Sequence, residues 1–183
     1  MGADDPGAAK GGFAPLVDGP DFIWTEAHSR AADQLRFAIR SRLPVTLMIG
    51  TEGTGKTRLA RDVVENASDG LVVGFIENPA VLGDDPDQIL QRARPYLFAA
   101  QSQQGLGLPV LVIDDAHRLE SATLSRLVDL AEPSASEPAH LKLVLLGPPG
   151  FSDTLHTLRP QAVGPLIELN PLGKKDVETF VAA

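Results

Sequence analysis

Residues 50–57 read Gly-Thr-Glu-Gly-Thr-Gly-Lys-Thr and follow directly on an apolar run, Val45 to Ile49. This spacing, G-x-x-x-x-G-K-[ST] between a predicted strand and a predicted helix, is typical of a loop that binds phosphate groups. Its glycines allow backbone conformations closed to other residues, so successive N–H groups can surround an anion. A helix predicted from Thr57 to about Asn66 would direct its positive end at the same anion.

The side chains of this loop have distinct predicted roles. Lys56 would place its charge at the β- and γ-phosphates of a nucleotide, and the Thr57 hydroxyl would ligate Mg²⁺. Arg58 could reach a phosphate or face solvent, whereas Glu52 and Thr54 would present backbone rather than side-chain groups. The predicted nucleotide-binding residues are Gly50, Thr51, Glu52, Gly53, Thr54, Gly55, Lys56, Thr57 and Arg58.

A second motif follows another apolar run, Val110 to Ile113, which ends in the acidic pair Asp114 and Asp115. In open α/β sheets, ligands bind outside the carboxyl ends of the strands, so Asp114 and the phosphate loop can face one pocket. Asp114 is expected to hold Mg²⁺, mostly through its water shell, and Asp115 to face the attacking water. The alternative is that the pair only ends a strand and caps a helix. The predicted catalytic residues are Lys56, Asp114 and Asp115, and the predicted metal ligands are Thr57 and Asp114.

Other polar residues give weaker signals. The histidines lack the spacing of a metal site and are expected to have surface or packing roles, although His117 follows the acidic pair and could lie near the γ-phosphate. Arg36 and Arg40 stand four residues apart on one face of a predicted helix. They form either a solvated face or a stripe that contacts DNA or a partner. The remaining histidines are His28, His140 and His156.

Composition limits the class of protein. The chain has 183 residues, a net charge of −8 and no cysteine, so we expect one ordinary domain without disulfides, and not a general binder of polyanions. No apolar run approaches the length of a membrane span, and no signal pattern opens the chain. The expected location is the cytoplasm.

Short apolar strands are predicted at 45–49, 71–76, 110–113, 141–146 and 166–169, and they alternate with helical segments. This order predicts an α/β fold, a three-layer αβα sandwich in which helices cover both faces of a parallel sheet. Thr25 is a predicted N-cap for a helix over 26–42, and a helical stretch is expected from Asp87 with a break at Pro95. Residues 1–20 are expected to be a flexible tail, and residues 21–171 the nucleotide-binding domain.

The order of these motifs resembles the ExeA/GspA-type ATPases of the AAA+ superfamily. The resemblance rests on the segment from Phe22 to His28, the phosphate loop, the segment from Ile113 to Leu119, and Leu145-Leu146-Gly147-Pro148-Pro149. It implies a five-stranded sheet in the order 5-1-4-3-2, ATP as the nucleotide, and a position near the adenine for the segment from Phe22 to His28. Residues 172–183 resemble the start of that family's helical lid, which would be largely absent.

Three departures from the family pattern bear on hydrolysis. The acidic pair is usually Asp-Glu, and here the second residue is the shorter Asp115. A polar residue that senses the γ-phosphate often follows the fourth strand's glycine, and here that place holds Pro148. The region before the fifth strand lacks a clear arginine finger, which leaves Arg159 as the nearby candidate. Losing such an arginine can remove roughly 10³–10⁵ in rate, so nucleotide binding should survive these changes better than turnover.

The sequence therefore predicts an ATP-binding AAA+ ATPase domain that uses Mg²⁺ and hydrolyses ATP slowly to drive or signal a partner's conformational change. One alternative is a nucleotide-gated scaffold with little hydrolysis, and another is a DNA-associated helper ATPase. By family likeness, the expected partners are proteins of envelope or secretion machinery, and a nucleotide-dependent homo-oligomer is a further expectation.

Overall fold

A computed structural model describes residues 24–41, 43–66, 72–79, 87–89, 91, 109–132, 141–160 and 163–171 of the chain. The predicted tail, the break at Pro95, His140 and the predicted lid over 172–183 lie outside these residues. Residues 87–89 are helical, as expected near Asp87. Five strands form one parallel sheet: β1 (Val45–Ile49), β2 (Val73–Ile76), β3 (Val110–Ile113), β4 (Lys142–Gly147) and β5 (Val163–Glu168).

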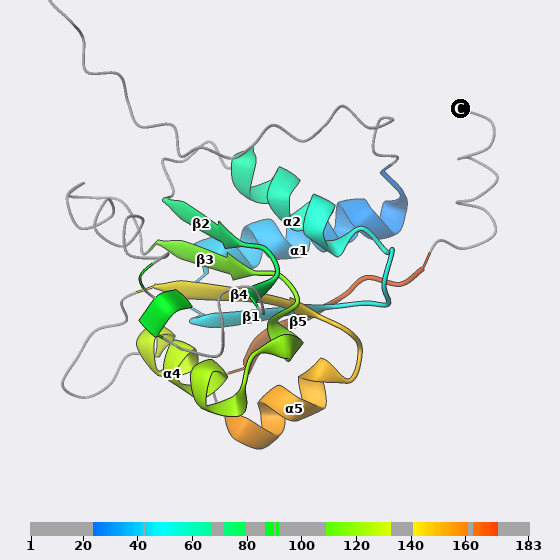
Figure 1. Ribbon diagram of the computed structural model, residues 1–183. Coiled ribbons are helices and arrows are strands. Elements are labelled where there is room, and N and C mark those ends of the chain that lie inside the picture. The colour runs from blue at the N-terminus through cyan, green and yellow to red at the C-terminus, as the bar shows by residue number, and fades with distance from the viewer. Residues whose placement is uncertain are drawn as a thin grey trace, which may run out of the picture.

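The strand order is β2-β3-β4-β1-β5, which confirms the predicted order 5-1-4-3-2. Helices lie on both faces of this sheet, as Figure 1 shows, so the predicted three-layer architecture is also confirmed. Helices α1 and α2 cover one face, and α4 and α5 cover the other. Their bounds are α1 (Glu26–Arg40), α2 (Lys56–Glu65), α4 (Ser121–Ala131) and α5 (Phe151–Leu158), with a short 3₁₀ turn, η2 (Ala116–Arg118).

Alternate residues of each strand belong to two separate hydrophobic cores, one on each face of the sheet, because successive side chains of a strand point to opposite faces. Leu47 and its neighbours on β3 and β4 pack under α4 and α5. Met48, the next residue, belongs instead to the core under α1 and α2. All five residues of β1 are buried, which explains why this strand reads as an unbroken apolar run.

The fifth strand differs from the prediction, since it runs over Val163–Glu168 rather than 166–169. Gly164 and Pro165 read as strand breakers in the sequence. In the structure β5 is an edge strand paired only with β1, where a proline is tolerated. Glycine is required at 164 because a Cβ there would lie 2.5 Å from the carbonyl oxygen of Val45.

Helix α1 is secured at both ends. The predicted N-cap is confirmed, since the Thr25 hydroxyl accepts a hydrogen bond from the backbone N–H of His28. At the other end, the ammonium of Lys142 on β4 donates to the carbonyl oxygens of Ile39, at 2.6 Å, and Ser41. A cation at the carboxyl end of a helix satisfies carbonyls that have no partner within the helix.

Candidate nucleotide site

The two sequence motifs meet at the carboxyl edge of the sheet. The loop of residues 50–55 leaves β1, Asp114 leaves β3, and β4 lies between them. The N–H of Gly50 donates to the carbonyl oxygen of Gly147 at the end of β4, and the N–H of Asp114 donates to Ile76 at the end of β2. Both motifs are therefore anchored to neighbouring strands.

The loop glycines serve two different purposes. Gly53 and Gly55 have φ values of +79° and +85°, the left-handed region in which a side chain is strained. Gly50 is required for space, because a Cβ there would lie 2.4 Å from the carbonyl oxygen of Leu169. Gly55 is the N-cap of α2 and has no side chain to cap the first amides, so these N–H groups remain available to an anion.

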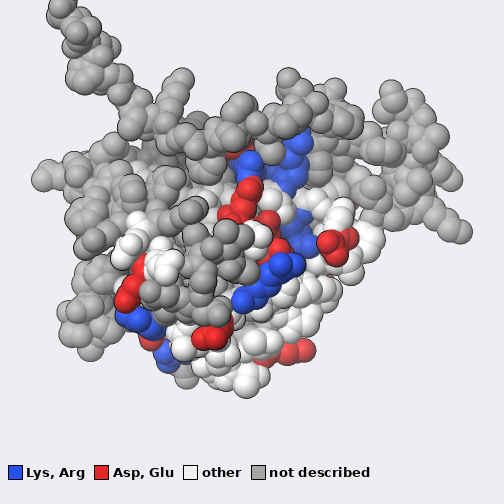
Figure 2. Space-filling model, viewed as in Figure 1, with Lys and Arg blue, Asp and Glu red and all other residues white. Residues whose placement is uncertain are grey.

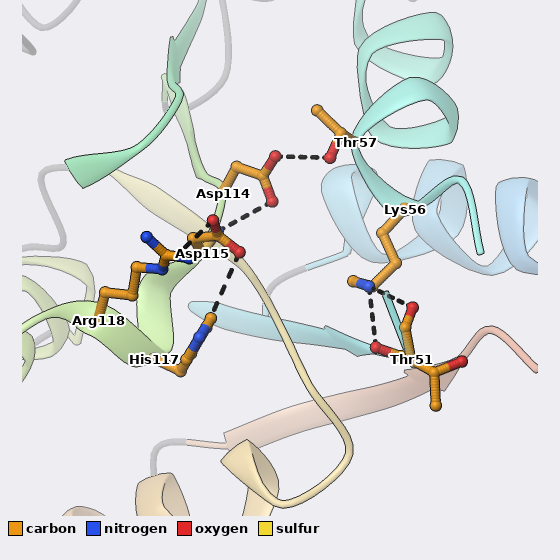
Figure 3. Close-up of polar contacts among 8 residues, drawn as sticks. Thr51, Lys56, Thr57, Asp114, Asp115, His117 and Arg118 are labelled. Carbon is orange, nitrogen blue, oxygen red and sulfur yellow. Dashed lines mark hydrogen bonds and ion pairs between the residues drawn. The ribbon is translucent and has the colours of Figure 1, made fainter. Parts of the chain in front are cut away.

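Lys56, the first residue of α2, folds back over the loop. Its ammonium donates to the carbonyl oxygens of Gly50 and Thr51, each at 2.8 Å (Figure 3). The positive charge is thus held at the loop itself, close to the amides that precede α2.

Thr57 and Asp114 meet although they are far apart in the sequence. The Thr57 hydroxyl donates to Asp114 Oδ2 at 2.5 Å, and Asp114 Oδ1 accepts from the N–H of Asp115 at 2.9 Å. A hydroxyl and a carboxylate suit Mg²⁺, which prefers oxygen ligands and retains several waters. Among the described residues, no group of three or more acidic, histidine or cysteine side chains is arranged to hold a metal ion.

Asp115 lies beside this pair but turns toward other partners. Its carboxylate is 3.6 Å from Arg118 Nε and 4.0 Å from His117 Nδ1, as seen in Figure 3. Its φ of +49° places it in the left-handed region, which aspartate tolerates better than most residues. Asp115 precedes the turn η2 but makes no side-chain cap bond there. The His117 ring also packs edge-on against Phe151, with centroids 6.3 Å apart.

Pro148 and Arg159, the residues at two of the departures from the family pattern, both lie after β4 and make contacts within the chain. Pro148 comes directly after β4, and its carbonyl oxygen accepts from the N–H of Phe151 at 3.0 Å. Arg159 stands at the end of α5 and forms an ion pair with Asp129 of α4 at 2.5 Å. Arg159 is therefore already engaged within its own chain.

Sequence reasoning missed the role of His28. We expected a surface or packing histidine. His28 is buried, at 4% exposed, and in addition contacts the phosphate loop, with Nε2 at 3.0 Å from the carbonyl oxygen of Thr54. The available signal was its place three residues after the N-cap Thr25, where a polar side chain can turn back to the cap. In contrast, His156 is exposed, and its Nδ1 lies 2.9 Å from the Ser152 carbonyl oxygen of its own helix.

The face of α1 that carries Arg36 and Arg40, expected to be either solvated or a contact stripe, also carries acidic groups. Arg36 Nη1 lies 2.9 Å from Asp33 Oδ1, so part of its charge is already balanced. Figure 2 shows acidic and basic side chains intermixed on the face in view. Among the described residues, no helix combines the length and apolar character that a membrane span requires.

A family model and a known protein are similar to this chain. Residues 84–155 match a family model described as AAA domain. The General secretion pathway protein A of Aeromonas hydrophila is 23% identical in an alignment that takes in 88% of this chain and 34% of that protein. The chain thus spans about a third of the length of this relative.

Two solved structures share the fold. A Cdc6p crystal structure from Pyrobaculum aerophilum matches 90% of this chain and 51% of its own, with a TM-score of 0.63 and 18% identity. The S. cerevisiae Hsp104–ADP complex matches 85% of this chain and 23% of its own, with a TM-score of 0.59 and 14% identity. Residues 84–155 therefore match an AAA domain, the fold is AAA+-like, and the chain shows distant homology to General secretion pathway protein A.

Proposed function

We propose that this AAA domain binds ATP with Mg²⁺ at residues 50–57 and hydrolyses it slowly to change the state of a protein partner. The contact between Thr57 and Asp114 carries the proposal, because it joins the loop after β1 to the acidic residue after β3. A nucleotide site of this kind needs a loop hydroxyl beside a carboxylate from a neighbouring strand, and this contact supplies that pair.

The residues of the site would divide the work of binding phosphate, holding the metal and orienting water. The amides of residues 53–57 surround the phosphates, and Lys56 stabilises negative charge on the β- and γ-oxygens. Thr57 and Asp114 would hold Mg²⁺, which when bound neutralises charge on the phosphate oxygens. Asp115 accepts a hydrogen bond from the attacking water and so orients it toward the γ-phosphorus.

Slow turnover follows from the groups around Asp115. Its carboxylate is one methylene shorter than glutamate and already contacts Arg118 and His117, so it must reorient to hold a water in line. A misplacement on the order of 1 Å can cost about 100-fold in rate. Pro148 offers no side-chain hydrogen bond to the γ-phosphate.

The partner is proposed from the relative alone. General secretion pathway protein A is named for secretion, and we extend to this chain a protein partner in envelope or secretion machinery, met on the cytoplasmic side. Self-association in the presence of nucleotide belongs to the same proposal, since Arg159 could act on a neighbouring subunit once released from Asp129.

Phosphate release by the wild type and two variants tests hydrolysis. We expect slow magnesium-dependent turnover by the wild type, loss of both binding and turnover in Lys56→Ala, and binding without turnover in Asp115→Asn. His156→Ala, which removes an exposed histidine, serves as the control and should match the wild type. Turnover that is at background for the wild type, or equal in wild type and Asp115→Asn, removes the catalytic assignment.

A scaffold that holds ATP without hydrolysing it is the second candidate. The ion pairs of Asp115 with Arg118 and of Arg159 with Asp129 favour it, because they occupy the two groups that hydrolysis would need. Magnesium-dependent ATP binding without phosphate release at any protein concentration would establish this candidate instead.

A further inference from the structure

His28 is a buried polar group that connects α1 to the phosphate loop. Its two ring nitrogens have separate partners: Nδ1 lies 2.7 Å from the hydroxyl of Thr25, and Nε2 lies 3.0 Å from the carbonyl oxygen of Thr54. The side chain is 4% exposed, so water cannot readily replace either partner. His28 is not among the residues assigned above to the phosphates, the metal or the attacking water.

The partners determine which nitrogen carries the proton. A carbonyl oxygen only accepts, so Nε2 must be protonated to bond Thr54. The Thr25 hydroxyl already accepts from the N–H of His28, and its own proton can be donated to an unprotonated Nδ1. A proton on Nε2 therefore serves the contact with Thr54, and the Thr25 hydroxyl can pair with Nδ1.

The contact continues from Thr54 to the lysine of the site. Thr54 is 8% exposed, and its hydroxyl donates to the carbonyl oxygen of Thr51 at 2.8 Å. The Lys56 ammonium donates to the same Thr51 oxygen, also at 2.8 Å. One chain of hydrogen bonds therefore runs from His28 through Thr54 and Thr51 to Lys56.

We propose that His28 is a positioning residue that holds the phosphate loop in the shape that receives an anion. By engaging the Thr54 carbonyl, it fixes the backbone just before the amides and Lys56 that would receive a phosphate. This role rests on the nucleotide binding proposed above, and it makes α1 part of the nucleotide site although His28 touches no phosphate.

Calorimetric titration with ATP and Mg²⁺ tests the proposal on the full chain. His28→Ala should bind about tenfold more weakly or worse, because a buried carbonyl loses its donor and the loop loosens. His28→Gln places an amide nitrogen where Nε2 stood and should recover most of the affinity. His156→Ala is the matched control and should bind as the wild type does. Circular dichroism confirms that each variant is folded.

Hydrogen exchange without nucleotide gives an independent measurement. We expect amides of residues 53–57 to exchange faster in His28→Ala than in the wild type, and at the wild-type rate in His28→Gln. Equal affinity and equal exchange in His28→Ala and wild type would overturn the positioning role while leaving nucleotide binding intact. If the wild type binds no nucleotide, the proposed function fails, and the exchange rates alone then decide whether His28 shapes the loop.

Discussion

At the scale of single residues, the phosphate loop shows that one residue type can be required for unrelated reasons. Gly53 and Gly55 take backbone angles that other residues avoid, whereas Gly50 is held between β1 and the chain that follows β5. Asp115 takes a left-handed angle without being glycine, at the point where water would have to be oriented. Backbone strain of this kind is common at functional sites.

Gly50→Ala should destabilise the protein by about 1–3 kcal/mol, because the added Cβ would lie 2.4 Å from the Leu169 oxygen and the backbone would have to move. Gly150→Ala is the control, since a Cβ there meets nothing within 4 Å and its φ is −72°. We expect Gly150→Ala to change stability by less than about 0.5 kcal/mol. Urea unfolding measures both, and equal effects of the two substitutions would contradict the steric argument.

At the scale of elements, α1 is tied to other parts of the fold at both ends. His28 joins its first turn to the phosphate loop, and Lys142 of β4 donates to the carbonyls at its last turn. Partial burial at this position disfavours the charged form of Lys142 and lowers the pKa of its ammonium below the ordinary value of 10.5. Helix α1 is therefore held by polar contacts as well as by its apolar face.

Lys142→Met should lower the free energy of unfolding by about 1 kcal/mol at neutral pH, because two carbonyls lose their donor. The stability difference between wild type and variant should also depend on pH. The pKa of Lys142 is lower in the folded state than in the unfolded state. At pH values between the folded-state pKa and 10.5, the unfolded chain therefore binds more protons than the folded chain.

The wild type should therefore gain stability over Lys142→Met as pH rises through this interval, and the gain should be complete above 10.5. Denaturant unfolding of both proteins from pH 7 to 11 measures the difference, in which the titration of all shared groups cancels. A difference that stays flat or falls with pH would show that burial does not lower the pKa of Lys142.

At the scale of the whole molecule, the site is assembled by the sheet. The loop after β1 and the carboxylate after β3 are brought together because parallel strands end at one edge, with β4 between them. Helices on the two faces supply the remaining groups: Lys56 and Thr57 come from α2 on one face, and Asp115 leads to η2, which packs with the other core. Binding at this edge should therefore stabilise the entire domain.

ATP with Mg²⁺ should raise the midpoint of thermal unfolding. A ligand at 100 times its Kd adds about 2.7 kcal/mol to the free energy of unfolding when only the folded state binds. Thr57→Ala should lose the magnesium-dependent part of this gain, whereas Thr57→Ser keeps the hydroxyl that contacts Asp114 and should retain it. Thermal scans with ATP, with and without Mg²⁺, measure both. Equal gains in Thr57→Ala and Thr57→Ser would remove Thr57 from the proposed metal site.

Much of the fold was predictable because strands that are buried on both faces appear in the sequence as unbroken apolar runs. The runs at 45–49 and 110–113 match β1 and β3 in full, and the phosphate loop marks the turn into α2. The predicted start of β5 was wrong because Gly164 and Pro165 interrupt the apolar run that marks a strand. Only the edge position of β5 makes these two residues acceptable within it.

The sequence by itself predicted the fold class correctly and singled out the loop of residues 50–57 and the acidic pair as a proposed site, since each depends on residue types at fixed local spacing. Only the tertiary structure decided which way two of the long-range partners turn: Asp114 toward Thr57, and Arg159 toward Asp129. The same holds for His28 and Lys142, whose partners lie 26 and about 100 residues away in the chain. Contacts of this kind depend on how strands and helices pack in space, which local spacing does not encode.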